Sequence, residues 1–441
     1  MTESFESFES FESWGRFPKV RQEVFRPSWI ADPIPFKKFS SVLPYGQGRS
    51  YGDSCLNDGG TILVTDRLNR LMTFDAAAGV LRCEAGMTLR DVLHVIVPRG
   101  WFLPVSPGTQ FVSVGGAVAN DIHGKNHHKA GTFGRFVRRF ELLRSSGERL
   151  VCSPAENADV FAATVGGLGL TGLMTWIEFS LKRIPGPKMD VETVPFAGLE
   201  DFFRLSADSD RDFEYTVAWF DGFASPDRFR GLFYRGNHAS PEDKVKLPSF
   251  QARLSVPFDL PSGLLNRWTI RAFNRLYHDW NAHKPAHRSV TYRSFFYPLD
   301  AVSHWNRVYG RRGFFQYQCV VPLGGAGRRP LAPLLEEVTR SGQGSFLAVL
   351  KVFGDLASPG LLSFPRPGVT LALDFPNRGR KTLDLLERLD AVVRGSGGAV
   401  YPAKDARMSA AAFQAFFPRW REFAKFVDPK FSSSFWRRVT T

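Results

Sequence analysis

The segment 114–128 constrains the fold more than any other part of the chain, because a run of small residues leads directly into a polar cluster. Gly115 and Gly116 leave the backbone bare, and alanines follow, so a flat ligand can lie against this segment. The polar residues then run from Asp121 to His128. Taken alone, the segment also suits a glycine turn followed by a solvated loop. The two interpretations differ in whether a ligand lies there, and the rest of the chain must decide between them.

The size and composition of the chain indicate an ordinary globular protein, with one exception. Its 441 residues suffice for two or three domains, and 43% hydrophobic with 23% charged residues are typical values. The exception is the 41 phenylalanines. Apolar rings in such number fill cores, but they also line pockets for lipid-like substrates or cover an edge that rests on a membrane.

The formal net charge of +14 predicts attraction to phosphate groups of nucleic acid, lipid or a small molecule. The sequence has no Cys/His finger spacing, no heptad-backed basic helix and no dense basic tract beyond pairs such as Arg138–Arg139. We therefore expect no nucleic-acid partner and favour a phosphate-bearing ligand or a membrane surface. A non-catalytic basic protein that binds nucleic acid or anionic membrane remains the alternative from another class.

Neither a disulfide framework nor a metal site is expected. His123, His127 and His128 hint at a metal, but Gly124 interrupts any helix that would present them together, and no carboxylate or cysteine nearby completes a ligand set. Contact between His123 and a ligand on the small-residue segment is the favoured interpretation. The cysteines are scattered without a CxxC pair, which suits free thiols: Cys55, Cys83, Cys152 and Cys319.

The sequence shows neither a membrane span nor a secretion signal. No apolar stretch approaches the length of about 20 residues that a spanning helix needs. The N-terminus lacks a basic region followed by an apolar core. Residues 1–15 instead carry a tandem Phe-Glu-Ser repeat. We expect them to form a disordered extension, with an amphipathic surface contact as the alternative.

Helices and strands are predicted to mix in the first part of the chain. Thr88 can cap a helix over Thr88–Ile96, and a second helix is predicted over Glu156–Val165. Strands are predicted at three places: Thr61–Thr65, Val80–Glu84 and Leu173–Ile184.

A linker rich in Pro and Gly at 183–187 marks a change of character. Residues 237–287 are richer in Pro, Lys and Arg and less periodic than their surroundings, so a mobile loop is expected there. After Gly398 the chain is expected to become helical and basic, and to end near Phe431. Aromatic-rich strands are predicted beyond the linker: Tyr215–Phe220, Phe314–Val321 and Phe346–Phe353.

Two further glycine clusters bear on the ligand. The segment 44–53 has three glycines in a turn whose N–H groups can point at one anion, such as a pyrophosphate, although an ordinary glycine turn explains it equally well. The segment 166–172 contains GxGxxG, but a predicted helix precedes it and a strand follows. A nicotinamide-binding Rossmann site needs the reverse order, so we exclude it. These glycines are expected to close a turn beside a ligand that the other clusters hold.

In their order along the chain, the three glycine clusters resemble the PCMH-type FAD-binding domain of the vanillyl-alcohol-oxidase family, where such loops hold the pyrophosphate and isoalloxazine of FAD. Further motifs are similar to those of the decaprenylphosphoryl-β-D-ribose 2′-oxidases within this family, and the similarity covers nearly the whole chain beyond the N-terminal extension. These motifs are 48–53, Pro107–Thr109, Asp121–His128, 163–167, Trp305–Arg307, Asp374–Pro376 and Ala403–Arg407.

The resemblance implies an α+β fold of two domains. Residues 16–186 would form the FAD-binding domain, and residues 187–398 a substrate-binding domain with an antiparallel sheet. Residues 399–441 would return to the FAD-binding domain.

The resemblance also implies site residues. Lys404, His123 and Tyr51 are the expected catalytic residues. FAD contacts are expected from Tyr45, Gly46, Gln47, Gly48, Arg49, Ser50, Tyr51, Gly52, Ser54, Gly108, Ser113, Val114, Gly115, Gly116, Asn120, Asp121, Ile122, His123, Met174 and Tyr401. Substrate contacts over the flavin are expected from Lys125, Trp219, Tyr309, Gln316, Gln318, Lys351, Thr370, Ala372 and Lys404.

Some positions depart from the family pattern. Many members of the wider family bind FAD covalently through a histidine in the first glycine loop. That position is Arg49 here, so FAD is expected to be held non-covalently. A cysteine that mycobacterial members carry before the Asp-Phe-Pro motif is Ala372, and a nearby asparagine is Thr370. Since alanine cannot act as a nucleophile, the chemistry of an active chain cannot depend on that cysteine.

The implied reaction is oxidation of the 2′-hydroxyl of a polyprenylphosphoryl-β-D-ribose to the 2-keto sugar, with hydride passing to the flavin. A separate nicotinamide-dependent keto-reductase would complete the epimerisation to the arabinose donor for cell-wall polysaccharide. Lys404 is the first candidate to hold or deprotonate the hydroxyl, which requires its pKa to be lowered towards 7 or 8. The alternative for Lys404 is an ion pair with Asp405.

We expect a peripheral protein on the cytoplasmic or periplasmic face of the inner membrane. The rival enzymatic interpretation is a FAD-dependent sugar or aldonolactone oxidase that returns electrons to oxygen.

Overall fold

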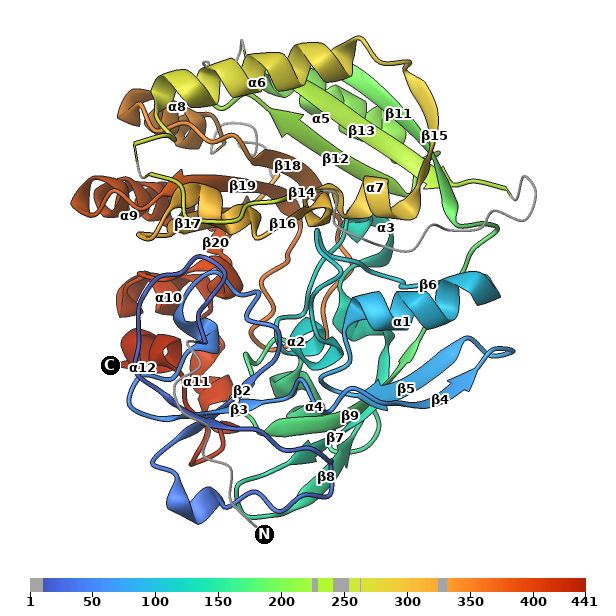
Figure 1. Cartoon of the computed structure of the whole chain (residues 1–441), viewed down its shortest axis with the longest axis vertical. Helices are drawn as coiled ribbons and strands as arrows, with labels where there is room; N and C mark the ends of the chain where they lie inside the picture. The colour runs from blue at the N-terminus through green and yellow to red at the C-terminus, as the bar shows by residue number, and fades with distance from the viewer. Residues whose placement is uncertain (1–10, 224–228, 241–253, 262, 324–330) are drawn as a thin grey trace.

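The computed structural model describes residues 11–223, 229–240, 254–261, 263–323 and 331–441. One large sheet with helices on both faces forms the upper part of the molecule, and two smaller sheets with short helices form the lower part (Figure 1). The C-terminal helices lie in the lower part beside the N-terminal strands (Figure 1). The fold is therefore α+β with two parts, as the resemblance implied.

The lower part contains a parallel and an antiparallel sheet. The parallel sheet has the strand order β1-β3-β2, the antiparallel sheet has the order β4-β5-β9-β7-β8, and β6 pairs separately with β10. The strands are β1 (Glu23–Phe25), β2 (Val42–Tyr45), β3 (Thr61–Val64), β4 (Leu71–Asp75), β5 (Val80–Glu84), β6 (Trp101–Phe102), β7 (Val137–Leu143), β8 (Arg149–Cys152), β9 (Leu173–Ser180) and β10 (Lys182–Arg183).

The helices of the lower part confirm the expected capping and periodicity. The side chain of Thr88 accepts a hydrogen bond from the N–H of Asp91 and caps α1, which buries Leu89, Val92 and Ile96 on one face. α4 precedes the third glycine cluster and β9 follows it, so the order that excludes a Rossmann site is confirmed. The helices are α1 (Leu89–Ile96), α2 (Val114–Ala119), α3 (His127–Ala130) and α4 (Ala158–Thr164).

The upper part is an eight-stranded antiparallel sheet in the order β15-β11-β13-β12-β18-β19-β17-β20. Its strands are β11 (Lys188–Ala197), β12 (Tyr215–Phe220), β13 (Arg230–His238), β15 (His287–Thr291), β17 (Phe314–Val321), β18 (Ala348–Phe353), β19 (Gly368–Pro376) and β20 (Ala399–Val400). Its helices are α5 (Gly198–Ser209), α6 (Arg267–Ala282), α7 (Tyr292–Phe296), α8 (Leu331–Ser341) and α9 (Arg380–Gly395), and β14 (Leu254–Ser255) pairs with β16 (Val302–Ser303).

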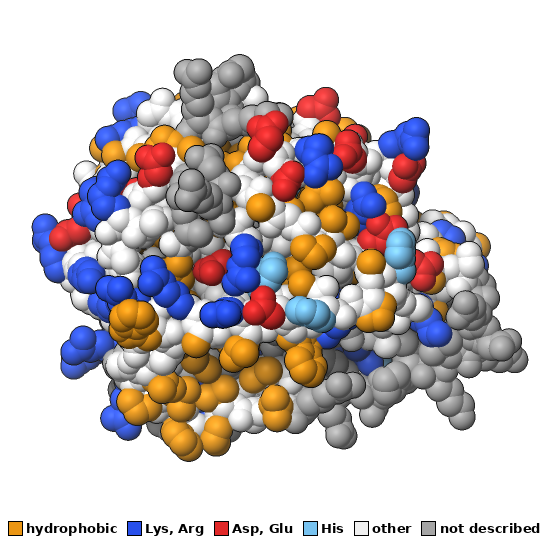
Figure 2. Space-filling view, turned by 90° about the horizontal axis from the view of Figure 1, so that it is seen from above, with side chains coloured by type: hydrophobic (Ala, Val, Ile, Leu, Met, Phe, Trp, Pro, Cys, Tyr) orange, Lys and Arg blue, Asp and Glu red, His pale blue; other side chains and the backbone are white. Residues whose placement is uncertain are grey.

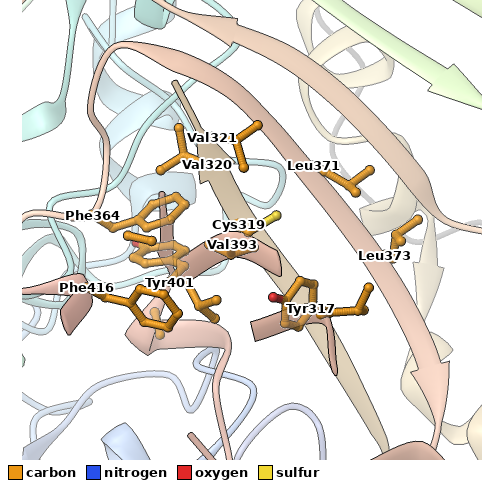
Figure 3. Close-up of a cluster of buried hydrophobic side chains, with 14 of the residues drawn as sticks. Tyr317, Cys319, Val320, Val321, Phe364, Leu371, Leu373, Val393, Tyr401 and Phe416 are labelled. Carbon is orange, nitrogen blue, oxygen red and sulfur yellow. The ribbon is translucent and has the colours of Figure 1, made fainter. Parts of the chain in front are cut away.

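The central strands of this sheet alternate between two environments. On β17, Gln316 and Gln318 face a cavity, whereas Tyr317 and Cys319 point into the hydrophobic core on the opposite face. Figure 3 shows Tyr317 and Cys319 in that core together with Val393 of α9. This period of two is the ordinary consequence of strand geometry, and it delivers polar side chains to one face of the sheet.

The C-terminal segment joins both parts. It begins as β20, paired with β17, and continues through α10 (Ala410–Phe416), α11 (Trp420–Ala424) and α12 (Ser434–Thr440). Arg438 of α12 donates to Asp53 Oδ1 at 2.7 Å and to Asp405 Oδ2 at 2.9 Å. The expected end of the helical region near Phe431 is therefore wrong, because α12 follows it and anchors two loops of the lower part.

Two other expectations need correction. The disordered extension expected over 1–15 is wrong for residues 11–15, while residues 1–10 lie outside the described residues. Ser13 is 2% exposed, and the N–H of Trp14 donates to Ser50 O at 2.8 Å. The mobile loop expected over 237–287 is wrong for α6, whose N-terminus has a complete capping box at Asn266.

Among the described helices, none combines the length and apolar character that crossing a bilayer requires.

Candidate active site

A cavity of about 830 Å³ lies between the two parts of the molecule. The glycine clusters of the lower part form one wall, and the polar face of the large sheet forms the other. The volume is near the upper end of the range for ligand pockets. Many predicted site residues line the cavity: Gly46, Gln47, Gly48, Arg49, Ser50, Tyr51, Ser54, Gly108, Ser113, Gly115, Gly116, Asn120, Ile122, His123, Lys125, Met174, Trp219, Gln316, Gln318, Lys351, Thr370, Ala372, Tyr401 and Lys404.

The loop after β2 offers hydrogen-bond donors to an anion. The N–H groups of residues 47–50 have no backbone acceptor among the described residues. Gly48 has φ +60°, and a Cβ there would lie 2.1 Å from Tyr45 Oη, so this turn requires glycine. Ser54 Oγ is buried without a hydrogen-bond partner in the described chain and lines the cavity. These donors fit the pyrophosphate of FAD.

The second glycine cluster along the chain, which begins at Val114, forms a cavity wall without large side chains, as expected from its small residues. The N–H of Gly115 donates to Ala85 O at 2.7 Å, and a Cβ on Gly115 would lie 3.0 Å from Ala85 Cβ. Gly116 lines the cavity, and a Cβ on Gly108 would meet no atom within 4 Å. The backbone can therefore approach a planar ring system closely, which fits the isoalloxazine of FAD.

Five of the predicted site residues do not line the cavity, and the first three are engaged elsewhere in the lower part. Tyr45 Oη donates to Glu12 O at 2.7 Å. A Cβ on Gly52 would lie 1.7 Å from Asp405 O, so this glycine serves close packing of two loops. Val114 is buried in the hydrophobic core. The fourth and fifth are Asp121 and Tyr309, whose side chains are held by hydrogen bonds.

Asp121 is a structural anchor in the structure, although a FAD contact was expected. Its Oδ1 accepts from the N–H of Gly134 at 2.8 Å. Its Oδ2 accepts from the hydroxyls of Ser358, at 2.5 Å, and Ser363. Asp121 therefore ties the connection between β18 and β19 to the lower part of the molecule.

A chain of hydrogen-bond contacts runs from Thr370 to Lys351 among the residues that line the cavity. Thr370 Oγ1 donates to Cys319 O at 2.8 Å, so it must accept from Gln318 Nε2, at 3.2 Å. The same amide nitrogen lies 2.9 Å from His123 Nε2. His123 then accepts at Nε2 and carries its proton on Nδ1, which lies 3.1 Å from Lys351 Nζ.

This arrangement favours neutral His123 and neutral Lys351. Burial lowers the pKa of His123 well below its usual range, and protonation of Lys351 lowers that pKa further. Burial also lowers the pKa of Lys351 to about 7. An N–H at Nδ1 can donate to the amine only when the amine is neutral.

Lys404 lies beside Tyr51 and near the carboxylate of Asp374. Its Nζ is 3.7 Å from the ring centroid of Tyr51. Burial lowers the pKa of Lys404 to about 7, against the opposing effect of the Asp374 carboxylate. Gln316 Nε2 donates to Asp374 Oδ1 at 2.7 Å, and Tyr309 Oη donates to Asp374 Oδ2 at 3.2 Å. Tyr309 therefore contacts Asp374 and does not line the cavity, where a direct substrate contact was expected.

The ion pair considered for Lys404 and Asp405 is absent among the described contacts. The carboxylate of Asp405 instead accepts from Arg438 and from the N–H groups of Arg407 and Met408. Lys404 is thereby left facing the cavity, with Asp374 as its acidic neighbour.

Lys125 lines the cavity but is anchored by the backbone of the upper part. Its Nζ donates to Phe295 O at 2.7 Å and to Phe296 O at 3.2 Å. Burial lowers the pKa of Lys125 to about 7, with a further contribution from the charge of Lys351. An amine that already donates to two carbonyls is less available to a substrate than Lys404 is.

His127 and His128 take no part in the cavity lining. His127 packs against the ring of Phe353 at 4.3 Å between centroids, and a ring nitrogen of His128 lies 3.4 Å from Phe213 O. Among the described residues, no group of three or more His, Cys, Asp or Glu side chains could hold a metal ion.

Several residues in or next to the cavity could not be predicted from the sequence. Trp14 lines the cavity and its ring lies 4.1 Å from the guanidinium of Arg49, although it belongs to the expected disordered extension. Lys284 and Arg288 line the cavity from the segment after α6. Asp374 belongs to a motif that the resemblance included, but its place beside Lys404 follows from cross-strand pairing with Gln316, which no local pattern reveals.

Comparison with known proteins agrees with this geometry. The FAD binding domain family matches residues 37–153. The chain is 35% identical over 421 residues to decaprenylphosphoryl-β-D-ribose oxidase of Mycolicibacterium smegmatis, covering 90% of this chain and 89% of that protein. It is 33% identical over 373 residues to an uncharacterized protein of Streptomyces coelicolor, covering 80% of this chain and 100% of that protein. A D-lactate dehydrogenase of Anaerostipes hadrus is 28% identical over 167 residues, covering 36% of this chain and 35% of that protein.

Proposed function

This chain belongs to the decaprenylphosphoryl-β-D-ribose oxidase family of FAD-dependent oxidoreductases, and from that premise we propose that it oxidises the 2′-hydroxyl of a polyprenylphosphoryl-β-D-ribose to the 2-keto sugar. The observation that carries the proposal is Lys404, which faces the cavity beside Tyr51 of the first glycine cluster and has a pKa lowered to about 7. A non-catalytic basic binding protein is set aside, because the chain is an enzyme with a FAD-binding domain.

FAD supplies the acceptor for the hydride that leaves the sugar carbon. The donors that would hold its pyrophosphate are the N–H groups of residues 47–50 and Ser54 Oγ. The bare backbone at Gly115 and Gly116 would accommodate the ring system. We infer that the attachment is non-covalent, because Arg49 lies at the position of the linking histidine and an arginine does not form that bond.

Lys404 is the proposed base for the 2′-hydroxyl. A lysine can accept a proton near neutral pH only if its pKa is lowered, and burial does this here. Lys351 has a similarly lowered pKa, but its Nζ is already engaged with His123 Nδ1 at 3.1 Å. Lys125 is anchored to two carbonyls. Of the three lysines, Lys404 is therefore the best placed to hold and deprotonate the hydroxyl.

Tyr51 and Asp374 would position Lys404. The Tyr51 ring beside Nζ favours the ammonium that forms when the base takes its proton. The Asp374 carboxylate stabilises the same charge from another side. His123, with Gln318 and Lys351, would orient the sugar without itself moving a proton, because its pKa lies well below neutral.

The cavity offers matching surfaces for the phosphate and for the prenyl chain of the proposed substrate. Lys284 and Arg288 line the cavity, and Arg288 Nε is buried without a partner among the described residues, so these cations suit the phosphodiester. Trp219, Tyr234 and Val349 offer apolar surface for the prenyl chain. We propose further that a nicotinamide-dependent keto-reductase consumes the product and that the enzyme works peripherally at a membrane surface.

The decisive experiment is anaerobic mixing of the FAD-loaded protein with farnesylphosphoryl-ribose while the visible flavin band is followed. Bleaching of that band is expected. No bleaching with this substrate, together with peroxide production from free sugars or aldonolactones in air, would replace the proposal with the oxygen-dependent sugar oxidase.

A further inference from the structure

The helix α6 has a buried face that closes the cavity. Ile270 and Asn274 are buried, and Asn274 Nδ2 donates to Asp221 Oδ1 at 2.8 Å. Tyr277 and Asn281 of the same helix line the cavity. The helix is therefore held firmly on the large sheet, and the cavity reaches its inner side.

A second face of α6 presents large apolar side chains to solvent. Trp268, Leu276 and Trp280 are 66%, 71% and 72% exposed, and Phe273 is 46% exposed. Trp268, Leu276 and Trp280 are separated by multiples of four residues, which places them on one side of the helix, and Phe273 lies on the same side between them. Such exposed rings on a firmly capped helix indicate an interaction surface.

A basic stripe borders the apolar face. Arg267, Arg271 and Arg275 also follow one another at intervals of four residues and are exposed. The acidic residue of the helix, Asp279, is paired with Arg230 Nη1 at 3.3 Å and with Arg275 Nε at 3.8 Å. Figure 2, viewed from above, shows apolar side chains gathered on this face with Lys and Arg side chains along one side.

We propose that the apolar face of α6, defined by Trp268, Phe273, Leu276 and Trp280, docks into the surface of an anionic lipid bilayer. An interfacial helix has aromatic and aliphatic residues on one face and Arg or Lys beside them, which is the arrangement of α6. Tryptophan is favoured at the level of the head groups, and arginines attract anionic lipid.

The bilayer is preferred to a second copy of the chain for two reasons. The formal net charge of +14 repels another copy but attracts anionic lipid. The inner side of α6 lines the cavity, so a docked helix places the entrance for a prenyl chain at the membrane surface. This second reason rests on the proposed function, whereas the first does not.

The test uses the FAD-loaded full chain and flotation with vesicles. Vesicles that contain phosphatidylglycerol should bind the protein, and vesicles of phosphatidylcholine alone should bind it much less. The triple variant Trp268→Ser, Leu276→Ser and Trp280→Ser should weaken binding by more than about 100-fold. Each of Arg271→Gln and Arg275→Gln should weaken binding to the anionic vesicles by about fivefold at low salt.

A matched control distinguishes binding through the apolar face of α6 from binding through any exposed tryptophan. Trp29 is 56% exposed and lies in the lower part of the fold, so Trp29→Ser should leave vesicle binding unchanged. Circular dichroism and thermal melting of the triple variant should match those of the unaltered protein. Equal vesicle binding by the triple variant overturns the proposal. A second outcome also overturns the proposal. In that outcome the unaltered protein is a dimer, the triple variant is a monomer, and neither binds vesicles.

Failure of the membrane-docking proposal can be distinguished from failure of the proposed function. The triple variant should bleach its flavin normally with soluble farnesylphosphoryl-ribose, because none of its three altered residues lines the cavity. It should fail with a decaprenyl substrate embedded in vesicles. If the unaltered protein binds vesicles but no ribose substrate bleaches its flavin, the docking surface stands and the proposed function falls.

Discussion

The Nζ of Lys404 lies 3.7 Å from the centroid of the Tyr51 ring, although the two residues are far apart in the sequence. The ring belongs to the first glycine loop, and the N–H of Tyr51 donates to Ala403 O at 2.8 Å, beside Lys404. The backbone contact and the ring contact together fix the lysine relative to the loop that would hold the pyrophosphate of FAD. The proposed base and the cofactor loop are thus parts of one rigid unit.

Replacement of this lysine tests its role directly. Lys404→Ala should retain FAD, because no predicted pyrophosphate donor is lost, but should slow substrate-driven bleaching of the flavin by about 100-fold or more. Stopped-flow absorbance under anaerobic conditions measures the rate. Lys129→Ala, an exposed lysine outside the cavity, serves as the control. Normal bleaching in Lys404→Ala would remove this residue from the mechanism.

The pH dependence of bleaching should report the Lys404–Asp374 pair. A base works when it is neutral, so the rate should rise as pH passes upward through about 7, the lowered pKa of Lys404. Burial raises the pKa of Asp374 to about 7 as well, so the two groups titrate together.

The variant Asp374→Asn removes the carboxylate that stabilises the ammonium of Lys404. The pKa of Lys404 should fall further, and the rising limb of the pH profile should move to lower pH. Asp355→Asn, at an exposed position, is the control and should leave the profile in place. A limb that stays fixed or moves to higher pH in Asp374→Asn would show that another group sets it.

The attachment of FAD can be tested without substrate. Because Arg49 stands where a linking histidine would be, acid precipitation should release the flavin into the supernatant. Absorbance of supernatant and redissolved pellet gives the answer. Flavin that stays with the pellet would contradict the non-covalent attachment.

Gly108 offers a test of the ring site. A Cβ there meets no atom of the chain within 4 Å, and the residue lines the cavity. Gly108→Leu should therefore fold with an unchanged melting temperature of the apoprotein but fill space that FAD needs, so that purified protein lacks yellow colour. Gly395→Leu, at the end of α9, is the matched control, because a Cβ there also meets no atom within 4 Å. A yellow Gly108→Leu protein would place the ring elsewhere.

The parts of the fold that sequence reasoning predicted are those with a local signal. Thr88 caps α1 as expected, and the strands Tyr215–Phe220 and Phe314–Val321 are confirmed with the same bounds. The helix α6 was missed for a physical reason. Its large apolar residues, such as Trp268 and Trp280, face solvent, so it lacks the core-facing stripe by which a helix is usually identified.

The candidate site likewise has parts that the sequence predicts and parts that it does not. The glycine clusters and Lys404 belong to contiguous motifs and could be named from the sequence. The link from Thr370 to Lys351 through Gln318 and His123 depends on three separate strands and the loop after α2, and it could not be predicted from the sequence. Trp14 was likewise missed, because its packing against Arg49 is a long-range contact of a segment with no periodicity.

The double contact of Arg438 with Asp53 and Asp405 has a consequence for the order in which the protein is made. Asp53 lies in the first glycine loop region, so that loop acquires its final support only after residue 438 has been synthesised. All the described strands will have been synthesised before the cofactor loop is fixed. Cofactor loading is thus expected to follow completion of the chain, and a nascent chain stalled before α12 should not retain FAD.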